Sequence, residues 1–339
     1  MKIIKSFGKF LLAGITASLI ISIILCVYSL TPVHIENPEK NTDYIWEPNS
    51  CWVTMEEGIG GGKYDANGFN NAKVIENPDI IIVGSSHVEG RNVTQKENMS
   101  FILNDMFEGK HEIYNMGISG HHFYKTCQYI PASLDRFEVT PKLVLVESAI
   151  VELSKDQVEA AINGTVEFSP SHGEGLIAFL QKIPILRVLY SQMEDGLFDL
   201  FMPELQPTVV TNTESVENVE KQINIDIEAY ELMFDYLASI EEKYNTEIVI
   251  FYHPEEVLEQ DGTISFKKNE CSPVFATEAS KKGIDFIDMQ SYFETMYYEE
   301  HKVPHGFITG KAAYGHMNAD GHRAIAYVLY DVINKMEEQ

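Results

Sequence analysis

A serine that could act as a nucleophile stands directly after a short apolar run. Residues 80–83 read Ile-Ile-Ile-Val, typical of a strand buried in a parallel sheet, and they lead into Gly84, Ser85 and Ser86. Open parallel sheets bind their ligands beyond the carboxyl ends of the strands, so Ser86 falls where chemistry is expected. The glycine permits a tight turn, and N–H groups at the start of a following helix can stabilise an oxyanion.

A histidine-bearing segment near the C-terminus offers a partner for this serine. Residues 315–322 read Gly-His-Met-Asn-Ala-Asp-Gly-His, and Asn318 is a natural N-cap for a helix predicted over 319–336. Between the two segments, residues 115–120 (Asn-Met-Gly-Ile-Ser-Gly) form another glycine turn after a predicted strand. Each feature also has a plainer interpretation, in which Ser86 only caps a helix and His316 lies in a surface turn.

The elements that must position these residues alternate along the chain. Short β-branched or apolar runs predict five strands, and the segments between them have helical character, as in residues 101–107 and 223–244. This alternation predicts an α/β fold, a three-layer sandwich with a mostly parallel sheet. Residues 155–220 interrupt the alternation and are interpreted as an insertion within a domain covering 78–339. The predicted strands are residues 80–83, 112–115, 143–146, 248–251 and 285–287.

The first thirty residues predict the compartment. Lys2, Lys5 and Lys9 precede an uncharged stretch over residues 10–30, about the ~20 residues that a helix needs to cross a bilayer. We expect a single-pass transmembrane anchor over 1–30 with a cytoplasmic N-terminus, a stalk over 31–77, and a domain outside the membrane. A cleaved signal peptide or a lipid-modified Cys26 are the alternatives.

Charge and cysteine content limit the partners and cofactors. The chain has 25 basic and 51 acidic residues, a formal net charge of −26, which argues against nucleic-acid binding. Outside the anchor, three cysteines remain at positions 51, 127 and 271; at most two of them can pair, and no C-x-x-C spacing indicates zinc. The adjacent residues His121 and His122 would face opposite ways on a strand. We therefore predict no metal and no cofactor.

Taken in order, these segments resemble the SGNH (GDSL-like) hydrolases. The pattern Gly84-x-Ser86-x-x-x-Gly90 is similar to the first block of that family, with Ser86 at the nucleophile position. Gly117 matches a glycine whose N–H contributes to the family's oxyanion hole, and His316 matches the catalytic histidine. The resemblance covers roughly residues 79–335, apart from the insertion, and implies an SGNH/flavodoxin-like fold and a serine-dependent acyl-ester chemistry.

Two departures from the family pattern leave the histidine without its usual partner. The family's aspartate three residues before the histidine is replaced by Ala313, and its third-block asparagine has no counterpart in residues 147–152. Candidate substitutes for the orienting carboxylate are Asp288 after the fifth predicted strand, Glu147 after the third, and Asp320 beside the histidine. A backbone carbonyl could also hold the ring, and the sequence does not choose among these.

The anchor, the Gly-Ser-Ser-His form and these departures resemble one subgroup of the family. Its members are membrane-anchored accessory proteins that work with membrane-bound O-acyltransferases in O-acylation or D-alanylation of envelope polymers. The resemblance implies an esterase or acyltransferase acting on an acylated cell-surface glycan or a teichoic-acid-like polymer, with a membrane-bound O-acyltransferase as a partner. The alternative is a catalytically silent scaffold of the same fold that binds a glycan or the acyltransferase.

Overall fold

The chain divides into two compact units, which are described separately. One comprises residues 1–30 and 169–224, the other residues 31–168 and 225–339. The computed structural model describes residues 2–28, 30, 32, 34–37, 44–55, 57–166, 225–307 and 312–338. Most of the insertion predicted over 155–220 therefore lies outside the described residues.

In the first unit the described element is helix α1, Lys2–Tyr28. Over the described parts of the chain, no helix combines the length and apolar character required to cross a bilayer.

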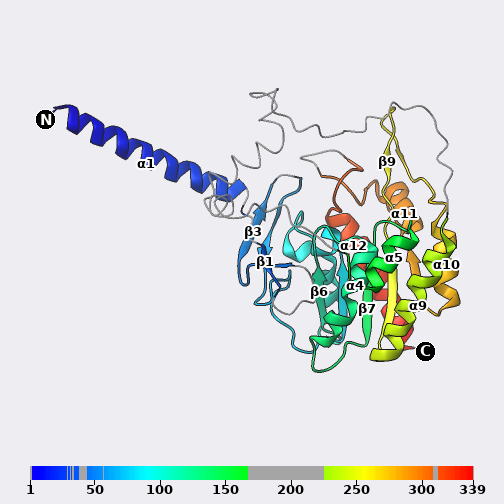
Figure 1. Cartoon of the computed structure of the whole chain (residues 1–339). Coiled ribbons are helices and arrows are strands. Elements are labelled where there is room, and N and C mark those ends of the chain that lie inside the picture. The colour runs from blue at the N-terminus through cyan, green and yellow to red at the C-terminus, as the bar shows by residue number, and fades with distance from the viewer. Residues whose placement is uncertain are drawn as a thin grey trace. The chain divides into compact units, whose positions relative to one another are not determined.

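The second unit is built on a five-stranded parallel sheet whose strands run in the order β11-β8-β7-β5-β6 (Figure 1). Numbered along the chain, this is the 2-1-3-4-5 order of flavodoxin-like folds, in which the strand order reverses between the first and third strands. The five strands are those predicted from the apolar runs, and the parallel sheet is confirmed. They are β5 Ile80–Gly84, β6 Ile113–Gly117, β7 Leu143–Ser148, β8 Glu247–Tyr252 and β11 Asp285–Asp288.

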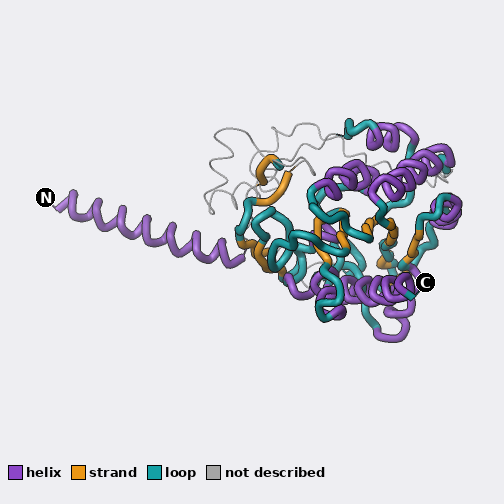
Figure 2. Tube along the Cα trace, turned by 90° about the horizontal axis from the view of Figure 1, so that it is seen from below, coloured by secondary structure: helices purple, strands orange, loops and turns teal. Residues whose placement is uncertain are grey.

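Helices cover both faces of this sheet, which gives the expected three layers (Figures 1 and 2). Alternate strand residues separate the two cores: Ile81 packs with one set of helices, and Ile82 packs with the other. The first set is α4 Phe123–Asp135, α5 Lys155–Ile162, α9 Ile227–Tyr244 and α10 Ser272–Lys281. The second set is α3 Met99–Phe107, α11 Gln290–Glu300 and α12 Ala319–Glu337.

The segment expected to be a stalk forms part of this compact unit. Its aromatic side chains Trp46, Trp52 and Tyr64 form a small buried core. The fully buried Glu89 accepts hydrogen bonds from Trp46 Nε1 at 2.6 Å and from the Tyr64 hydroxyl at 2.7 Å. These contacts hold residues 44–64 against the start of the domain. The segment contains two hairpins, β1 His34–Glu36 with β2 Tyr44–Trp46, and β3 Cys51–Thr54 with β4 Gly60–Lys63.

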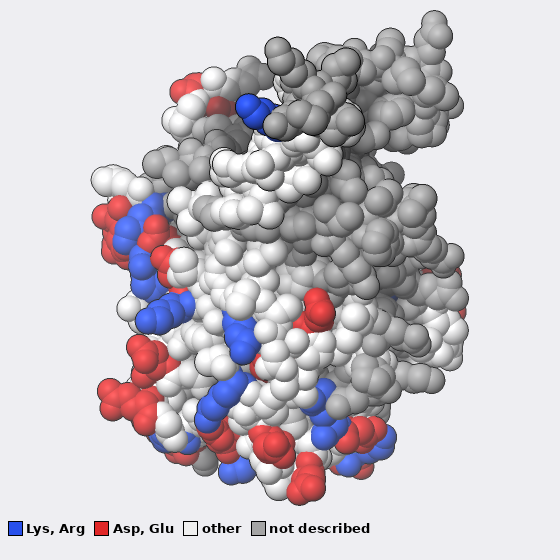
Figure 3. Space-filling model, turned by 90° about the vertical axis from the view of Figure 1, so that its left-hand side faces the viewer, with Lys and Arg blue, Asp and Glu red and all other residues white. Residues whose placement is uncertain are grey.

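The remaining described elements are short. Helix α2 (Ser86–Glu89) and the 3₁₀ helix η1 (Gln95–Glu97) follow β5, and strands β9 (Val257–Leu258) and β10 (Ile264–Ser265) pair as a ribbon after β8. The cysteines at positions 51, 127 and 271 are free thiols. Figure 3 shows acidic and basic side chains interspersed over the described part of one face.

Candidate functional site

Ser86 lies at the point where the strand order reverses, between β5 and β7. It is the first residue of α2, directly beyond β5. The N-cap of that helix is Ser85, whose hydroxyl accepts a hydrogen bond from the His87 N–H at 3.3 Å. Because Ser85 serves as the cap, the Ser86 hydroxyl is left for another partner. The interpretation of Ser86 as a mere helix cap does not fit this geometry.

That partner is His316. Its Nε2 lies 3.0 Å from the Ser86 Oγ, across 230 residues of sequence. On the other side of the ring, Nδ1 is hydrogen-bonded to a carboxylate oxygen of Glu57. The second oxygen of Glu57 accepts the backbone N–H of His316 at 2.8 Å. Ser86, His316 and Glu57 thus form the serine–histidine–carboxylate chain that activates a hydroxyl nucleophile.

Glu57 reaches the histidine from the turn between β3 and β4, and glycines make room for it. A Cβ on Gly315 would lie 1.7 Å from Glu57 Oε1, and the Gly315 backbone has a φ of +87°. A Cβ on Gly58 would lie 2.2 Å from the Asn92 carbonyl oxygen. The Asn92 side chain in turn donates to Glu57 Oε2 at 2.7 Å. Close approach of three backbone segments therefore fixes the carboxylate.

His316 and Glu57 are partly exposed to solvent, and an uncharged histidine lies beside them. The side chains of His316 and Glu57 are 40% and 30% exposed. Burial raises the pKa of Glu57, but the hydrogen bonds and charge of His316 outweigh it, and the pKa lies below its ordinary value. Beside them, burial and the neighbouring histidines hold the pKa of His87 well below its ordinary value. Glu57 is therefore ionised and His87 uncharged near neutral pH.

The carboxylates expected to orient His316 serve other groups. Asp288 accepts the Ser272 hydroxyl at 2.5 Å and the Gln290 N–H at 2.9 Å. Asp320 pairs with Arg323 and lies 3.7 Å from Lys302 Nζ. The turn between β3 and β4 places Glu57 against His316 Nδ1, so Glu57 and neither Asp288 nor Asp320 occupies the orienting position.

Glu147, the third candidate, lies in the site but acts on different residues. At the end of β7 and 2% exposed, it accepts the Ser85 N–H at 2.7 Å and bonds His253 Nε2 at 2.6 Å. A Cβ on Gly84 would lie 2.6 Å from the Glu147 Cβ, so glycine is needed for this approach. Glu147 therefore fixes the turn that carries Ser86 instead of orienting His316.

Gly117 lies beneath α2, but its N–H is already used. It donates to the Asn115 side-chain oxygen at 2.9 Å. A Cβ on Gly117 would lie 2.3 Å from the Glu89 N atom, so the glycine allows α2 to pack directly on the sheet. In this geometry the N–H expected to stabilise an oxyanion points to Asn115. The N–H of Ser86 remains, in a first helical turn whose N–H groups have no intrahelical acceptor.

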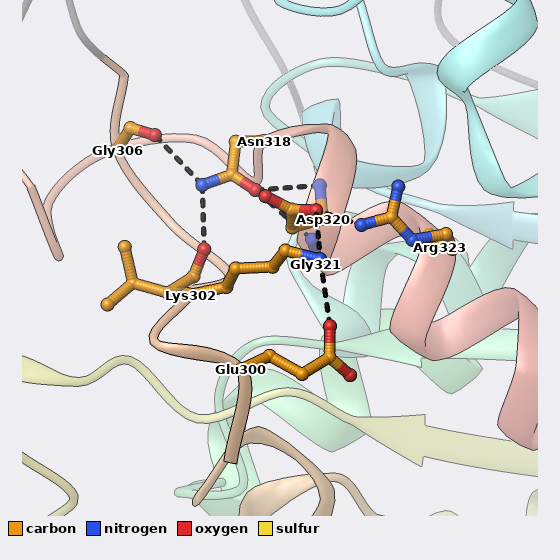
Figure 4. A network of polar contacts seen from close by, with 8 residues as sticks. Glu300, Lys302, Gly306, Asn318, Asp320, Gly321 and Arg323 are labelled. Carbon is orange, nitrogen blue, oxygen red and sulfur yellow. Dashed lines mark hydrogen bonds and ion pairs between the residues drawn. The ribbon is translucent and has the colours of Figure 1, made fainter. Parts of the chain in front are cut away.

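The loop before His316 is tied to it by the Asn318 side chain (Figure 4). The Asn318 amide donates to the Val303 and Gly306 carbonyls at 2.8 and 3.0 Å, and its oxygen accepts the N–H groups of Asp320 and Gly321. As predicted, Asn318 is the N-cap of α12. Residue 305 also pairs with residue 317 in an antiparallel bridge. Residues 301–307 are therefore held against the segment that carries His316.

Further histidines surround the site. His322 accepts the Met99 N–H at 3.3 Å, and burial together with neighbouring histidines lowers its pKa to about 3, so we interpret it as a structural residue. His253, at the end of β8, and His305 are 0% and 1% exposed and lie beside His87. No sequence motif singles out His305. For Glu57, the glycines that follow it were the only hint, since they mark close backbone contact.

Comparisons with known proteins give structural similarities only. Neither the models of protein families nor the curated proteins contain a match. Among solved structures, an acetyl xylan esterase aligns over 75% of this chain and 99% of its own, at 12% identity and a TM-score of 0.38. A catalytic mutant of an acetylxylan esterase from Geobacillus stearothermophilus aligns over 76% of this chain and 94% of its own, at 13% identity and a TM-score of 0.38. A protein from Lactobacillus plantarum aligns over 77% of this chain and 99% of its own, at 10% identity and a TM-score of 0.38. Similarity this low leaves the chemistry to be inferred from the site itself.

Proposed function

We propose that this protein is a serine-dependent acyl esterase or acyltransferase of the SGNH type. The observation that carries the proposal is the continuous hydrogen-bonded chain from Ser86 through His316 to Glu57. A histidine held on one side by a carboxylate presents an unprotonated nitrogen to the serine on the other. Such an arrangement makes the hydroxyl a nucleophile at neutral pH.

The reaction would run in two halves. Ser86 Oγ attacks the acyl carbonyl while its proton moves to His316 Nε2, and the Ser86 N–H donates to the developing oxyanion. The tetrahedral intermediate collapses, His316 returns the proton to the departing alcohol, and an acyl-serine remains. Water or a carbohydrate hydroxyl then attacks this ester with His316 again as the base. Glu57 stays ionised and balances the charge of the imidazolium.

As substrate, we propose an O-acylated polymer of the cell envelope, such as an acylated glycan or a teichoic-acid-like polymer. The resemblance of the Ser86 and His316 segments to anchored accessory proteins supports this choice. The same resemblance supports a membrane-bound O-acyltransferase as partner. We further propose that residues 1–30 anchor the chain in the cell membrane with the catalytic unit outside, on the basis of Lys2, Lys5 and Lys9 before an uncharged stretch.

One observation favours a second candidate function, a catalytically silent scaffold that binds a glycan or the acyltransferase. The Gly117 N–H is occupied by Asn115, and the sequence has Glu147 where the family's third block follows its strand. A poor oxyanion hole would slow acyl transfer even with an intact triad, since removing one donor costs about 10²–10³ in rate in comparable enzymes.

Labelling with a fluorophosphonate probe separates the two functions. The purified protein should be labelled, and the variants Ser86→Ala and His316→Ala should lose the label while keeping a folded circular-dichroism spectrum. His122→Ala is a matched histidine control, because this residue precedes α4 and has no hydrogen bond to the triad. Absence of labelling in the folded wild-type protein would favour the scaffold and direct attention to its binding partner.

A further inference from the structure

Three histidines beside the triad meet in one cluster, two of them buried and the third half-buried. His87, His253 and His305 come from α2, the end of β8 and the loop over 301–307, and one ring nitrogen of each lies within 4.8 Å of the others. The ring centroids of His87 and His253 are 4.5 Å apart, and His305 lies 5.6 Å from each of them. Each imidazole carries polar nitrogens that need partners when they are buried.

The hydrogen bonds of His253 and His305 fix where their protons lie. His253 Nε2 faces the Glu147 carboxylate at 2.6 Å, and His305 Nδ1 faces the Glu256 carboxylate at 2.8 Å. An ionised carboxylate only accepts hydrogen bonds, so the facing ring nitrogen carries the proton. In a neutral imidazole the opposite nitrogen then has a free lone pair. These opposite atoms, His253 Nδ1 and His305 Nε2, are buried and have no hydrogen-bond partner among the residues described.

We infer that His87, His253 and His305 form a binding site for a divalent transition-metal cation of the zinc type. Neutral imidazole nitrogens are the ligands that such ions prefer. A histidine that binds a metal commonly donates its other ring N–H to a carboxylate, as His253 does to Glu147 and His305 to Glu256. Both carboxylates are nearly inaccessible, at 2% and 3% exposed, so a bound cation would also offset two buried negative charges.

Binding of a cation would draw the three rings together. Tetrahedral zinc has Zn–N distances of about 2.0–2.1 Å, which place its nitrogen ligands about 3.3 Å apart, so nitrogens that lie within 4.8 Å of one another must approach by up to about 1.5 Å. His87 has one competing contact, a hydrogen bond from the Met317 N–H to Nδ1 of 3.3 Å, at the long limit of such bonds. A cation at this site would differ from the expectation of a metal-free protein, because the three histidines lie far apart in the sequence.

The position of the cluster suggests what the cation would do. Three protein nitrogens, with a further position left for water or substrate, is the ligand count of catalytic zinc sites. His87 directly follows Ser86, and its ring centroid lies 5.5 Å from that of His316. A cation there would stabilise the negative charge that develops on the acyl oxygen. The Gly117 N–H does not fill this role, because it donates to Asn115. This catalytic role rests on the proposed function, whereas the binding of the cation does not.

Titration of the metal-free full-length protein with Zn²⁺, followed by calorimetry, tests the site. We expect one Zn²⁺ per chain, an affinity of micromolar or tighter, and a higher thermal unfolding midpoint with the metal bound. His305→Gln should weaken binding at least 100-fold. Glu256→Gln should weaken it by about 10–100-fold, since it disturbs the hydrogen bonds that orient His305 and removes no proposed ligand. His111→Gln is the matched control, because this residue pairs with Glu337, outside the cluster.

Two further measurements make the outcome decisive. Co²⁺ in place of Zn²⁺ should give the visible absorption of a four-coordinate nitrogen site in the wild-type protein, so the test does not depend on whether a variant folds. Ser86→Ala should bind Zn²⁺ as the wild type does, which separates metal binding from acyl transfer. Absence of stoichiometric binding, or binding unchanged in His305→Gln, would overturn the inference.

Discussion

Glu57→Gln tests the triad more sharply than loss of the serine does, because it leaves the nucleophile and the base in place. The carboxylate contacts His316 at two places, at Nδ1 and at the backbone N–H, the latter at 2.8 Å. A glutamine has only one oxygen, so either placement of its amide puts an NH₂ group against one of these nitrogens. Placed against Nδ1, the NH₂ donates to it and forces the ring proton onto Nε2, which can then no longer accept the serine proton.

The expected loss follows from comparable triads. The same exchange of acid for amide costs about 10⁴ in kcat where the histidine is held in the wrong tautomer. We expect kcat/KM to fall by about 10³–10⁴, or roughly 4–5.5 kcal/mol of transition-state stabilisation. The kcat/KM of Glu57→Asp should lie between those of the wild type and Glu57→Gln, because its side chain is one methylene shorter and its carboxylate lies farther from His316.

The assay is hydrolysis of an activated acetate ester, with initial rates measured at neutral pH for the metal-free and Zn²⁺-supplemented protein. Asp288→Asn is the matched control, because it exchanges the same groups on a carboxylate that contacts Ser272 and Gln290 instead of His316. It should keep kcat/KM within about threefold of the wild type. A Glu57→Gln activity within tenfold of the wild type, with Ser86→Ala inactive, would refute the role of Glu57.

Two other outcomes follow from the same carboxylate. Gly315→Ala would place its Cβ 1.7 Å from Glu57 Oε1 and should abolish most activity. Gly283→Ala is the control, because Gly283 has a similar φ of +81° and no atom lies within 4 Å of the added Cβ. It should lose only about 1–2 kcal/mol of stability in urea unfolding and should keep its activity. The pKa of Glu57 lies below 4.5 in the folded protein, so its stabilisation is present above about pH 4.5 and is lost as the pH falls through the lower folded value. The difference in unfolding free energy between the wild type and Glu57→Gln should therefore shrink from pH 6 to pH 3, and a difference that grows over this interval would contradict the assignment.

The sequence alone predicted the sheet and the pairing of Ser86 with His316. Apolar runs of four or five residues are local signals, because a strand buried on both faces must be apolar along its length. They placed the five strands. Because ligands bind beyond the carboxyl ends of parallel strands, Ser86 after the first strand became the candidate nucleophile. His316 followed from the resemblance of residues 315–322 to the histidine block of the SGNH hydrolases. Both are short-range features that a reader of the sequence can recognise.

The tertiary structure decided which groups meet. Glu57 and His316 are separated by 259 residues, and nothing in the neighbourhood of either residue records the other. The contact between Glu57 and His316 depends on the paths of the two loops that carry them. Those paths depend on glycines such as Gly315, which permit close backbone approach. The same holds for His305, which reaches His87 only because its loop pairs with the residues around Met317. Hydrophobic periodicity encodes the layers of this fold, whereas long-range loop packing encodes its site.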